Sequence, residues 1–415
     1  MFSATGRELS RHWLAIIALI WSGQAISMFT SYAASFAAIW YVTESTGSAL
    51  ALALLSICAY LPQGLLSPFG GVVADRVNRK YIVIAADLFT GIASLILGLI
   101  ILLGHVSLAA LVIMVIVRSA GQAFHYPAMM AIMPMLVPEK HLLRINTLDQ
   151  LLLSVAGMVA PALGILLYTV LGFHSVMFLD FSGALLACTA MLLAKVPSPQ
   201  KQATPDAEAS AKRHVLNDLK EGWVALRSVR GLFMLIILIT LGMVCYSPMS
   251  SLYPLMTYDH FQGDGYMASI AEATFAGGLL VGSGILMAWG GGKRLTLLIA
   301  SACLFFGILC SVSGLLSPSL FWVFAVLCAG MGLVSAWFNG PMMTLIQRNS
   351  TEETMGRIIG LVTAASALAG PFGIALGGVF AEFAGVAPFF VVDGVLCAFL
   401  GVLIVSFKSI RALDE

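Results

Sequence analysis

The chain has 415 residues, of which 60% are hydrophobic and 10% charged, and its formal net charge is +1. A soluble globular domain carries about 25% charged residues, so this composition excludes one and predicts an integral membrane protein. Apolar runs recur along nearly the whole chain, each long enough for the roughly 20 residues with which a helix crosses a bilayer. We count twelve such runs, which predicts an all-α membrane fold with twelve transmembrane helices.

The first apolar run extends from Trp13 to about Tyr41. It is too long for a signal peptide and lacks a small-residue cleavage site, so we expect it to remain as the first helix. Trp21, Gln24 and Phe29 contribute to a polar and aromatic stripe along it. Such a stripe is unusual on a face that meets lipid, and it predicts a cavity or a partner helix.

A short polar stretch, residues 71–80, separates the second and third apolar runs. Its charged and small residues are Gly71, Asp75, Arg76, Arg79 and Lys80. An acid and three bases cannot lie in hydrocarbon, so the stretch predicts a tight turn where two membrane helices meet water.

Ionisable residues also occur inside the apolar runs of the first half, namely Asp87, Arg118 and Asp149, followed by Asp180. Each costs at least roughly 2.5 kcal/mol at the membrane centre unless it is paired or hydrated. Arg118 cannot release its proton and needs an acid or carbonyl groups, and Asp87 on the adjacent helix is a candidate partner. A static buried pair and a pair that tunes a proton-carrying carboxyl both fit. Asp149 lies near the start of its run, where pairing with basic residues of nearby turns is its simplest use.

Two further features mark the fourth and fifth runs. His125 follows Phe124 and either lines a cavity or bonds to a neighbouring helix. The fifth run contains Gly157, Pro161 and Gly164. Glycines at this spacing let helices approach closely, and the proline removes one backbone hydrogen bond and bends the helix.

The composition changes after the sixth run. Residues 197–211 are rich in Pro, Ser, Gln, Ala and charge, which predicts a linker. Apolar residues then recur at helical spacing among charged ones, which predicts an amphipathic helix at the membrane surface. We therefore expect a first bundle at 1–195, a linker at 196–230 and a second bundle at 231–415.

The second half contains fewer candidate sites. Glu272 lies about one turn inside the eighth run. A desolvated carboxyl there can exchange a proton near neutral pH or contact a cationic drug, and an interfacial glutamate that faces water is the simpler alternative. Trp337, Phe338 and Asn339 are candidates for a substrate cavity together with the aromatic residues of the first half, although such aromatic residues also serve in packing.

The two halves look related at an offset of 214 residues. Matching positions include Gly70 with Gly284, Phe124 with Phe338 and Pro127 with Pro341, and Asp180 recurs as Asp393 at an offset of 213. Parallel repeats of this kind place a substrate site near the bilayer midplane. The second copy has lost charge, since Ser301 replaces Asp87 and Gly332 replaces Arg118, so we expect the coupling chemistry in the first half. The symmetry of Asp180 and Asp393 favours a structural role over proton coupling.

Charge distribution predicts the orientation. With twelve spans, all 21 Lys and Arg residues except Arg118 fall on one side, which the positive-inside rule makes cytoplasmic, together with both termini. No basic patch suggests nucleic acid.

The seven cysteines lie in apolar runs without paired or metal-like spacing and are expected to pack. No catalytic constellation, metal cluster or phosphate loop is evident, so neither an enzyme nor direct use of ATP is expected.

The turn at 71–80 resembles the signature between the second and third helices of the major facilitator superfamily. In that family the small residue permits close helix contact, and the charges latch the cytoplasmic side in one of two states. Residues 157–164 resemble the helix-five motif of its antiporters, with Ala160 where the family has glycine. The chain further resembles macrolide-efflux proteins of the bacterial drug-antiporter branch, in stretches that include residues 21–25, 74–81, 117–119, 123–127 and 275–279.

The resemblance implies two pseudo-symmetric six-helix bundles that alternate access to a central cavity in a bacterial inner membrane. It implies export of a macrolide-like drug, driven by the proton gradient without a cofactor, in some members alongside an ATP-binding ribosome-protection partner. Arg118 resembles a helix-four arginine that tunes a carboxyl, so Asp87, Arg118, Asp149 and Glu272 are the proton-coupling candidates. The alternative is the same scaffold with a siderophore or a lysophospholipid as cargo.

Overall fold

A computed structural model describes residues 4–196, 223, 226–227, 229–350 and 352–414. Some side chains within these ranges lie outside the description, among them those of Asp75, Arg76 and Asn339. The described part of the chain is helical and contains no strand.

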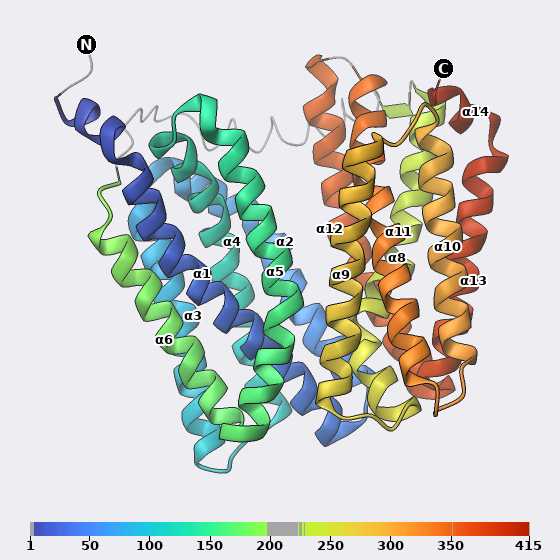
Figure 1. The fold of residues 1–415 in the computed structure, drawn as a ribbon, viewed down its shortest axis with the longest axis horizontal. Helices are drawn as coiled ribbons and strands as arrows, with labels where there is room; N and C mark the ends of the chain where they lie inside the picture. Colours follow the sequence, from blue (N-terminus) through green and yellow to red (C-terminus); the bar gives the residue numbers. More distant parts are fainter. Residues whose placement is uncertain (1–3, 197–222, 224–225, 228, 351, 415) are drawn as a thin grey trace. The chain divides into compact units, whose positions relative to one another are not determined.

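Within the described residues, twelve helices are long and apolar enough to cross a membrane. The six of the first half are α1 (Ala4–Thr46), α2 (Ala49–Arg76), α3 (Arg79–Leu102), α4 (Leu108–Leu136), α5 (Glu139–Leu171) and α6 (Phe173–Leu193). The six of the second half are α8 (Arg230–Leu255), α9 (Gly265–Trp289), α10 (Leu295–Leu315), α11 (Phe321–Arg348), α12 (Glu352–Ala384) and α13 (Val386–Ser406) (Figure 1). The π-helical turn η1 (Met256–His260) continues α8, and α14 (Lys408–Arg411) and η2 (Ala412–Asp414) follow α13. The predicted fold class is confirmed.

The chain forms two compact units. The first comprises Met1–Ser45 and Cys58–Ala203, and the second comprises Thr46–Ile57 and Thr204–Glu415. The start of α2 therefore belongs to the second unit, where Glu382 of α12 accepts hydrogen bonds from Ser48 Oγ at 2.9 Å and from Leu50 N at 3.1 Å. Nothing in the sequence indicates this exchange. The predicted limits of the bundles and the linker remain a prediction, since 197–222 lies outside the described residues.

In the first unit, small residues let α1 pack closely on two helices. A Cβ at Gly164 of α5 would meet the backbone of Ala33, and one at Gly183 of α6 would meet the side chain of Thr30. Gly164 of the predicted helix-five motif thus makes a close helix contact, and Pro161 is buried in the same helix. No described atom lies within 4 Å of a Cβ built on Gly157.

In the second unit, α13 packs on α10 and α11 packs on α9. A Cβ at Gly394 of α13 would meet the carbonyl oxygen of Gly307 and the amide of Ser311 on α10. A Cβ at Gly332 of α11 would meet the backbone of Phe275 on α9. The position that corresponds to Arg118 in the first half therefore has no room for a side chain.

The repeat is visible in α6 and α13, which both contain 21 residues. Gly172 precedes α6 with φ of 84°, and Gly385 precedes α13 with φ of 94°, a conformation that glycine adopts at little cost. Asp180 and Asp393 then occupy the same position, two turns inside their helices. The structure thus supports the equivalence of the two aspartates.

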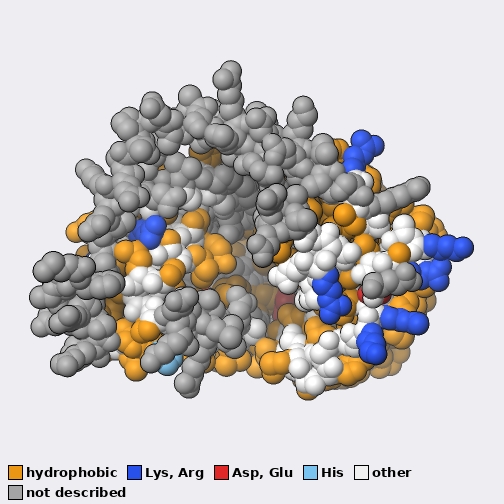
Figure 2. Space-filling model, turned by 90° about the horizontal axis from the view of Figure 1, so that it is seen from above, with side chains coloured by type: hydrophobic (Ala, Val, Ile, Leu, Met, Phe, Trp, Pro, Cys, Tyr) orange, Lys and Arg blue, Asp and Glu red, His pale blue; other side chains and the backbone are white. Residues whose placement is uncertain are grey.

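Exposed basic side chains of the second unit gather at the end where α10 begins and α14 lies (Figure 2). They include Lys293, Arg294, Arg348, Lys408 and Arg411. This agrees with the segregation of Lys and Arg in the sequence. Which side of the membrane this end faces remains a prediction.

The C-terminal turn η2 docks on the start of α10. Each carboxylate oxygen of Asp414 lies 3.2 Å from the amide nitrogen of Thr296. Oδ2 of Asp414 also accepts a hydrogen bond from the Thr296 hydroxyl. The free amides of a helix N-terminus favour such an anion. We expect Asp414→Ala to lower the free energy of unfolding by about 1 kcal/mol, measured by thermal unfolding of the purified protein in detergent. Lys408→Ala, an exposed change in the same tail, is the control, and equal effects of the two changes would contradict this role.

Candidate functional site

A network of hydrogen bonds in the first unit surrounds Asp180, which is 2% exposed. Ser31 Oγ of α1 donates to Asp180 Oδ1 at 2.7 Å, and Ser94 Oγ of α3 donates to Oδ2 at 2.6 Å. Arg118 of α4 forms an ion pair with Oδ2 and donates to Ser94 Oγ at 2.9 Å and to Ser31 O at 3.2 Å. Both carboxylate oxygens therefore have donors, and four helices meet at one buried ion pair.

The partner of Arg118 is thus Asp180, and the expectation that Asp87 pairs with Arg118 was wrong. The reason lies in how α3 packs, since it contacts both α4 and α6. Ser94, about two turns along α3 from Asp87, lies where the guanidinium and the Asp180 carboxylate meet. Because Arg118 forms an ion pair with Asp180 and two further hydrogen bonds, it fits the alternative of a static buried pair.

Asp87 is contacted by different side chains, which carry no permanent charge. It is 6% exposed on α3, and Gln24 Nε2 of α1 donates to its Oδ2 at 2.9 Å. Nε2 of His125 on α4 lies 3.3 Å from its Oδ1, and this histidine is charged only when protonated. No Lys or Arg of the described residues pairs with Asp87. A buried carboxyl whose partners are an amide and an imidazole can gain or lose a proton without breaking a permanent ion pair.

This arrangement also places two residues that we expected in a substrate cavity. Gln24 and His125 both lie against Asp87. His125 is thus close to a neighbouring helix, but its Nε2 has no hydrogen-bond partner among the described residues. The sequence signal for this site was the polar stripe of the first helix, but it did not indicate which acid the stripe would meet.

The other two coupling candidates lie apart from this network. Glu272 of α9 is half-buried, interacts electrostatically with Tyr253 and Cys328, and has no hydrogen bond or ion pair among the described residues. Asp149 precedes the membrane-spanning part of α5, and burial raises the pKa of its carboxyl. The basic side chains of the adjacent turn, which we expected to pair with Asp149, lie outside the described residues.

The described bases of the 71–80 turn bind helix carbonyls. Arg79 donates to the carbonyl oxygens of Ala74 and Ala131, each at 3.1 Å. Lys80 Nζ donates to those of Leu192 and Ala194, each at 2.8 Å. The two side chains thus satisfy carbonyls near the C-terminal ends of α4 and α6, where cations are favoured.

The structure describes less of the other residues in the predicted latch, namely Gly71, Asp75 and Arg76. The side chains of Asp75 and Arg76 lie outside the described residues. A Cβ on Gly71 would meet no described atom within 4 Å, whereas one on Gly70 would clash with the backbone of Ala123 on α4. The close approach of α2 to α4 is therefore made by Gly70, which sequence reasoning did not single out for this role.

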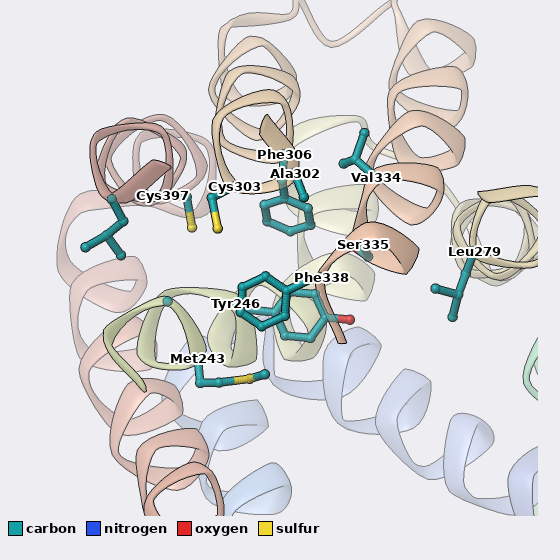
Figure 3. A pocket seen from close by; sticks show the side chains of 12 residues that line it. Met243, Tyr246, Leu279, Ala302, Cys303, Phe306, Val334, Ser335, Phe338 and Cys397 are labelled. Carbon is teal, nitrogen blue, oxygen red and sulfur yellow. The ribbon is translucent and has the colours of Figure 1, made fainter. Parts of the chain in front are cut away.

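A hollow of about 150 Å³ opens in the second unit among α8, α9, α10, α11 and α13 (Figure 3). The rings of Tyr246, Phe306 and Phe338 line it, together with the thiols of Cys303 and Cys397. Such a mostly apolar lining suits an apolar part of a ligand. Pockets that hold whole drug-sized molecules measure roughly 300–1,000 Å³, so this hollow has room for only part of such a molecule.

The predicted cavity residues do not all meet at this hollow. Phe338 lines it, while Trp337 Nε1 donates to Gly282 O at 3.3 Å. Trp21 and Phe124 pack against the core of the first unit, Phe29 is half-buried, and the side chain of Asn339 is outside the described residues. Tyr246 and Phe306 were missed, because an aromatic residue in an apolar run carries no signal that separates lining from packing.

The profile of the Major Facilitator Superfamily matches residues 20–373 of the chain. The chain belongs to this superfamily. It is 34% identical over 407 residues to macrolide efflux protein A of Streptococcus pyogenes, covering 98% of this chain and 99% of the relative. It is 28% identical over 388 residues to the multidrug efflux pump Tap of Mycobacterium tuberculosis, covering 90% and 89%.

Solved structures agree on the fold. A crystal structure of the peptide transporter POT matches with a TM-score of 0.73 at 14% identity, covering 96% of this chain and 95% of that one. The nucleoside transporter NupG matches with a TM-score of 0.68 at 12% identity, covering 95% and 99%. The resemblance inferred from the sequence is confirmed, and this member of the superfamily is a multi-pass efflux transporter of a bacterial membrane.

Proposed function

We propose that this transporter exports macrolide drugs in exchange for protons, by alternating access. The similarity to macrolide efflux protein A, which extends over 98% of the chain, carries the choice of cargo. The described lining of the hollow in the second unit contains no Lys or Arg, which suits a large apolar drug better than an anionic catecholate siderophore.

Asp87 supports the coupling to protons. Its carboxyl is buried against Gln24 and His125 and has no permanent cation beside it among the described residues. A proton that enters from outside removes its charge and alters these contacts, which shifts the balance between two conformations. The proton gradient is then the energy source, and no cofactor is needed.

The orientation and the partners belong to the same proposal. We place both termini and the 71–80 turn in the cytoplasm of a bacterial inner membrane, because the basic residues other than Arg118 segregate to that side. An ATP-binding resistance protein that works beside the transporter is part of the proposal as well.

Erythromycin accumulation in energised cells tests this function. Expression of the transporter should lower accumulation, and a protonophore should restore it. If the correctly inserted protein changes nothing, the macrolide cargo is rejected, and a lysophospholipid and a siderophore become the cargoes to test. If export persists with the protonophore, coupling to protons is rejected.

The hollow offers a steric test of the cargo site. Gly242 of α8 lines it, and a Cβ at Gly242 would meet no described atom within 4 Å. Gly242→Leu should fold normally, fill part of the hollow and weaken erythromycin binding by about 1–3 kcal/mol, measured by titration of the purified protein. Gly284→Leu on α9, where a Cβ also meets no described atom within 4 Å, is the matched control outside the lining. Equal affinity of the two variants would show that erythromycin does not occupy the hollow.

A further inference from the structure

The two repeat-equivalent aspartates have opposite environments. Asp180 receives two hydroxyl donors and a guanidinium. Asp393 is just as deeply placed, at 4% exposure, yet its Oδ2 is fully buried without any hydrogen-bond partner among the described residues. An unpaired charge in this position would cost several kcal/mol.

Two of the residues that donate to Asp180 are replaced at the corresponding positions around Asp393. At the offset of 214 residues, Ser31 corresponds to Cys245 and Arg118 to Gly332. The Cys245 thiol does contact the Asp393 carboxyl, as Ser31 contacts Asp180. A thiol is only a weak donor, however. At Gly332 the backbone of Phe275 fills the space, so no cation reaches Asp393 from α11.

The described side chains of the other helices around Asp393 supply no cation either. The titratable groups that interact with it are the thiols of Cys245 on α8, Cys310 on α10 and Cys397 one turn along α13. Cys310 Sγ is directed to the carbonyl of Phe390 at 3.3 Å. Among the described residues no group of three His, Cys, Asp or Glu side chains could hold a metal ion. With no base and no metal-binding group beside the carboxyl among the described residues, a proton is the cation that best fits this site.

We propose that Asp393 is a proton-binding site of the second unit, which holds the carboxyl as a neutral acid. Protonation removes the buried charge and leaves a hydroxyl that can donate to the sulfur of Cys245, which contacts the carboxyl. This site is separate from Asp87, so each repeat contains a buried acid that can bind a proton.

The site also borders the apolar hollow. Cys397 lines that hollow and lies one turn from Asp393 on the same face of α13, and Cys245 lies next to the lining residue Tyr246 on α8. A ligand in the hollow would contact Cys397, which lies between the hollow and the Asp393 carboxyl. Cargo binding and protonation of Asp393 are thereby linked, a step that rests on the proposed function, whereas the proton site itself does not.

Infrared difference spectra of the full-length protein in lipid nanodiscs test the proton site without any cargo. The carbonyl band of a protonated carboxyl should disappear in Asp393→Asn and persist in Asp180→Asn, the matched change at the equivalent position. Cys245→Ala should shift the frequency of this band, because it removes the group that faces the acid. A band unchanged in both Asp393→Asn and Cys245→Ala overturns the proposal, and the cysteine variant decides alone if Asp393→Asn does not fold.

The link to transport is measured separately. Erythromycin added to weakly buffered protein should change the number of bound protons in the wild type and change it less in Asp393→Asn, as followed by a pH indicator dye. Identical proton changes in the two proteins would overturn the link. An absence of erythromycin binding in the wild type would reject the proposed cargo, and the infrared result would still decide the proton site.

Discussion

Arg118→Met is expected to lower the free energy of unfolding by about 3–5 kcal/mol, because it leaves the buried carboxylate of Asp180 without its cation. The ion pair joins α4 to α6, and Arg118 also bonds to Ser94 of α3 and to the carbonyl of Ser31 on α1. Four helices thus lose a common contact. Unfolding of the purified protein in mixed micelles with increasing denaturing detergent measures the loss.

A double-mutant cycle separates the loss of the pair from the loss of the arginine itself. Arg118→Met with Asp180→Asn should recover much of the stability, since no charge is then buried alone. Asp180→Asn by itself should destabilise, since it leaves the guanidinium unpaired. If the double variant is as unstable as the sum of the single ones, the two side chains are not coupled and the network has been misassigned.

The sequence predicts the helices of this protein well, because hydropathy and length alone determine which segments can cross a bilayer. It also located the buried ionisable residues, since Asp87 and Arg118 are costly wherever they lie in a membrane. It did not predict their partners. Asp87 and Asp180 both lie on helices that can neighbour the helix of Arg118, so the sequence allows either as its ion-pair partner. The packing of α3 against both α4 and α6 decides between them.

Two other features depend on packing in the same way. The equivalence of Asp180 and Asp393 suggested one structural role for both, yet their surroundings differ because Cys245 has replaced the serine and Gly332 the arginine. The sequence already shows that Gly332 replaces Arg118, but only the structure identifies Arg118 and Ser31 as the partners of Asp180. The apolar hollow in the second unit was equally hidden, because its lining side chains are of the kinds that fill every membrane core.

Asp87→Asn is expected to abolish proton-driven export. Asparagine has the same shape and can still accept the hydrogen bond from Gln24, so the fold should be kept. It cannot carry a proton, so the gradient no longer drives the conformational change. Erythromycin accumulation in energised cells that express the variant should rise to the level of cells without the transporter, with equal amounts of protein in the membrane.

Two controls make this result specific to coupling. Downhill erythromycin exchange in proteoliposomes without a proton gradient should survive in Asp87→Asn, because that process needs no proton. His125→Asn removes the imidazole beside the carboxyl but not the carboxyl, so it should shift the pH dependence of export rather than abolish it. If Asp87→Asn exports as the wild type does and the protonophore stops both, the driving proton is carried by Asp149, Glu272 or Asp393. Asp393 would then be the first to test, because it is a deeply buried acid with an unpaired oxygen.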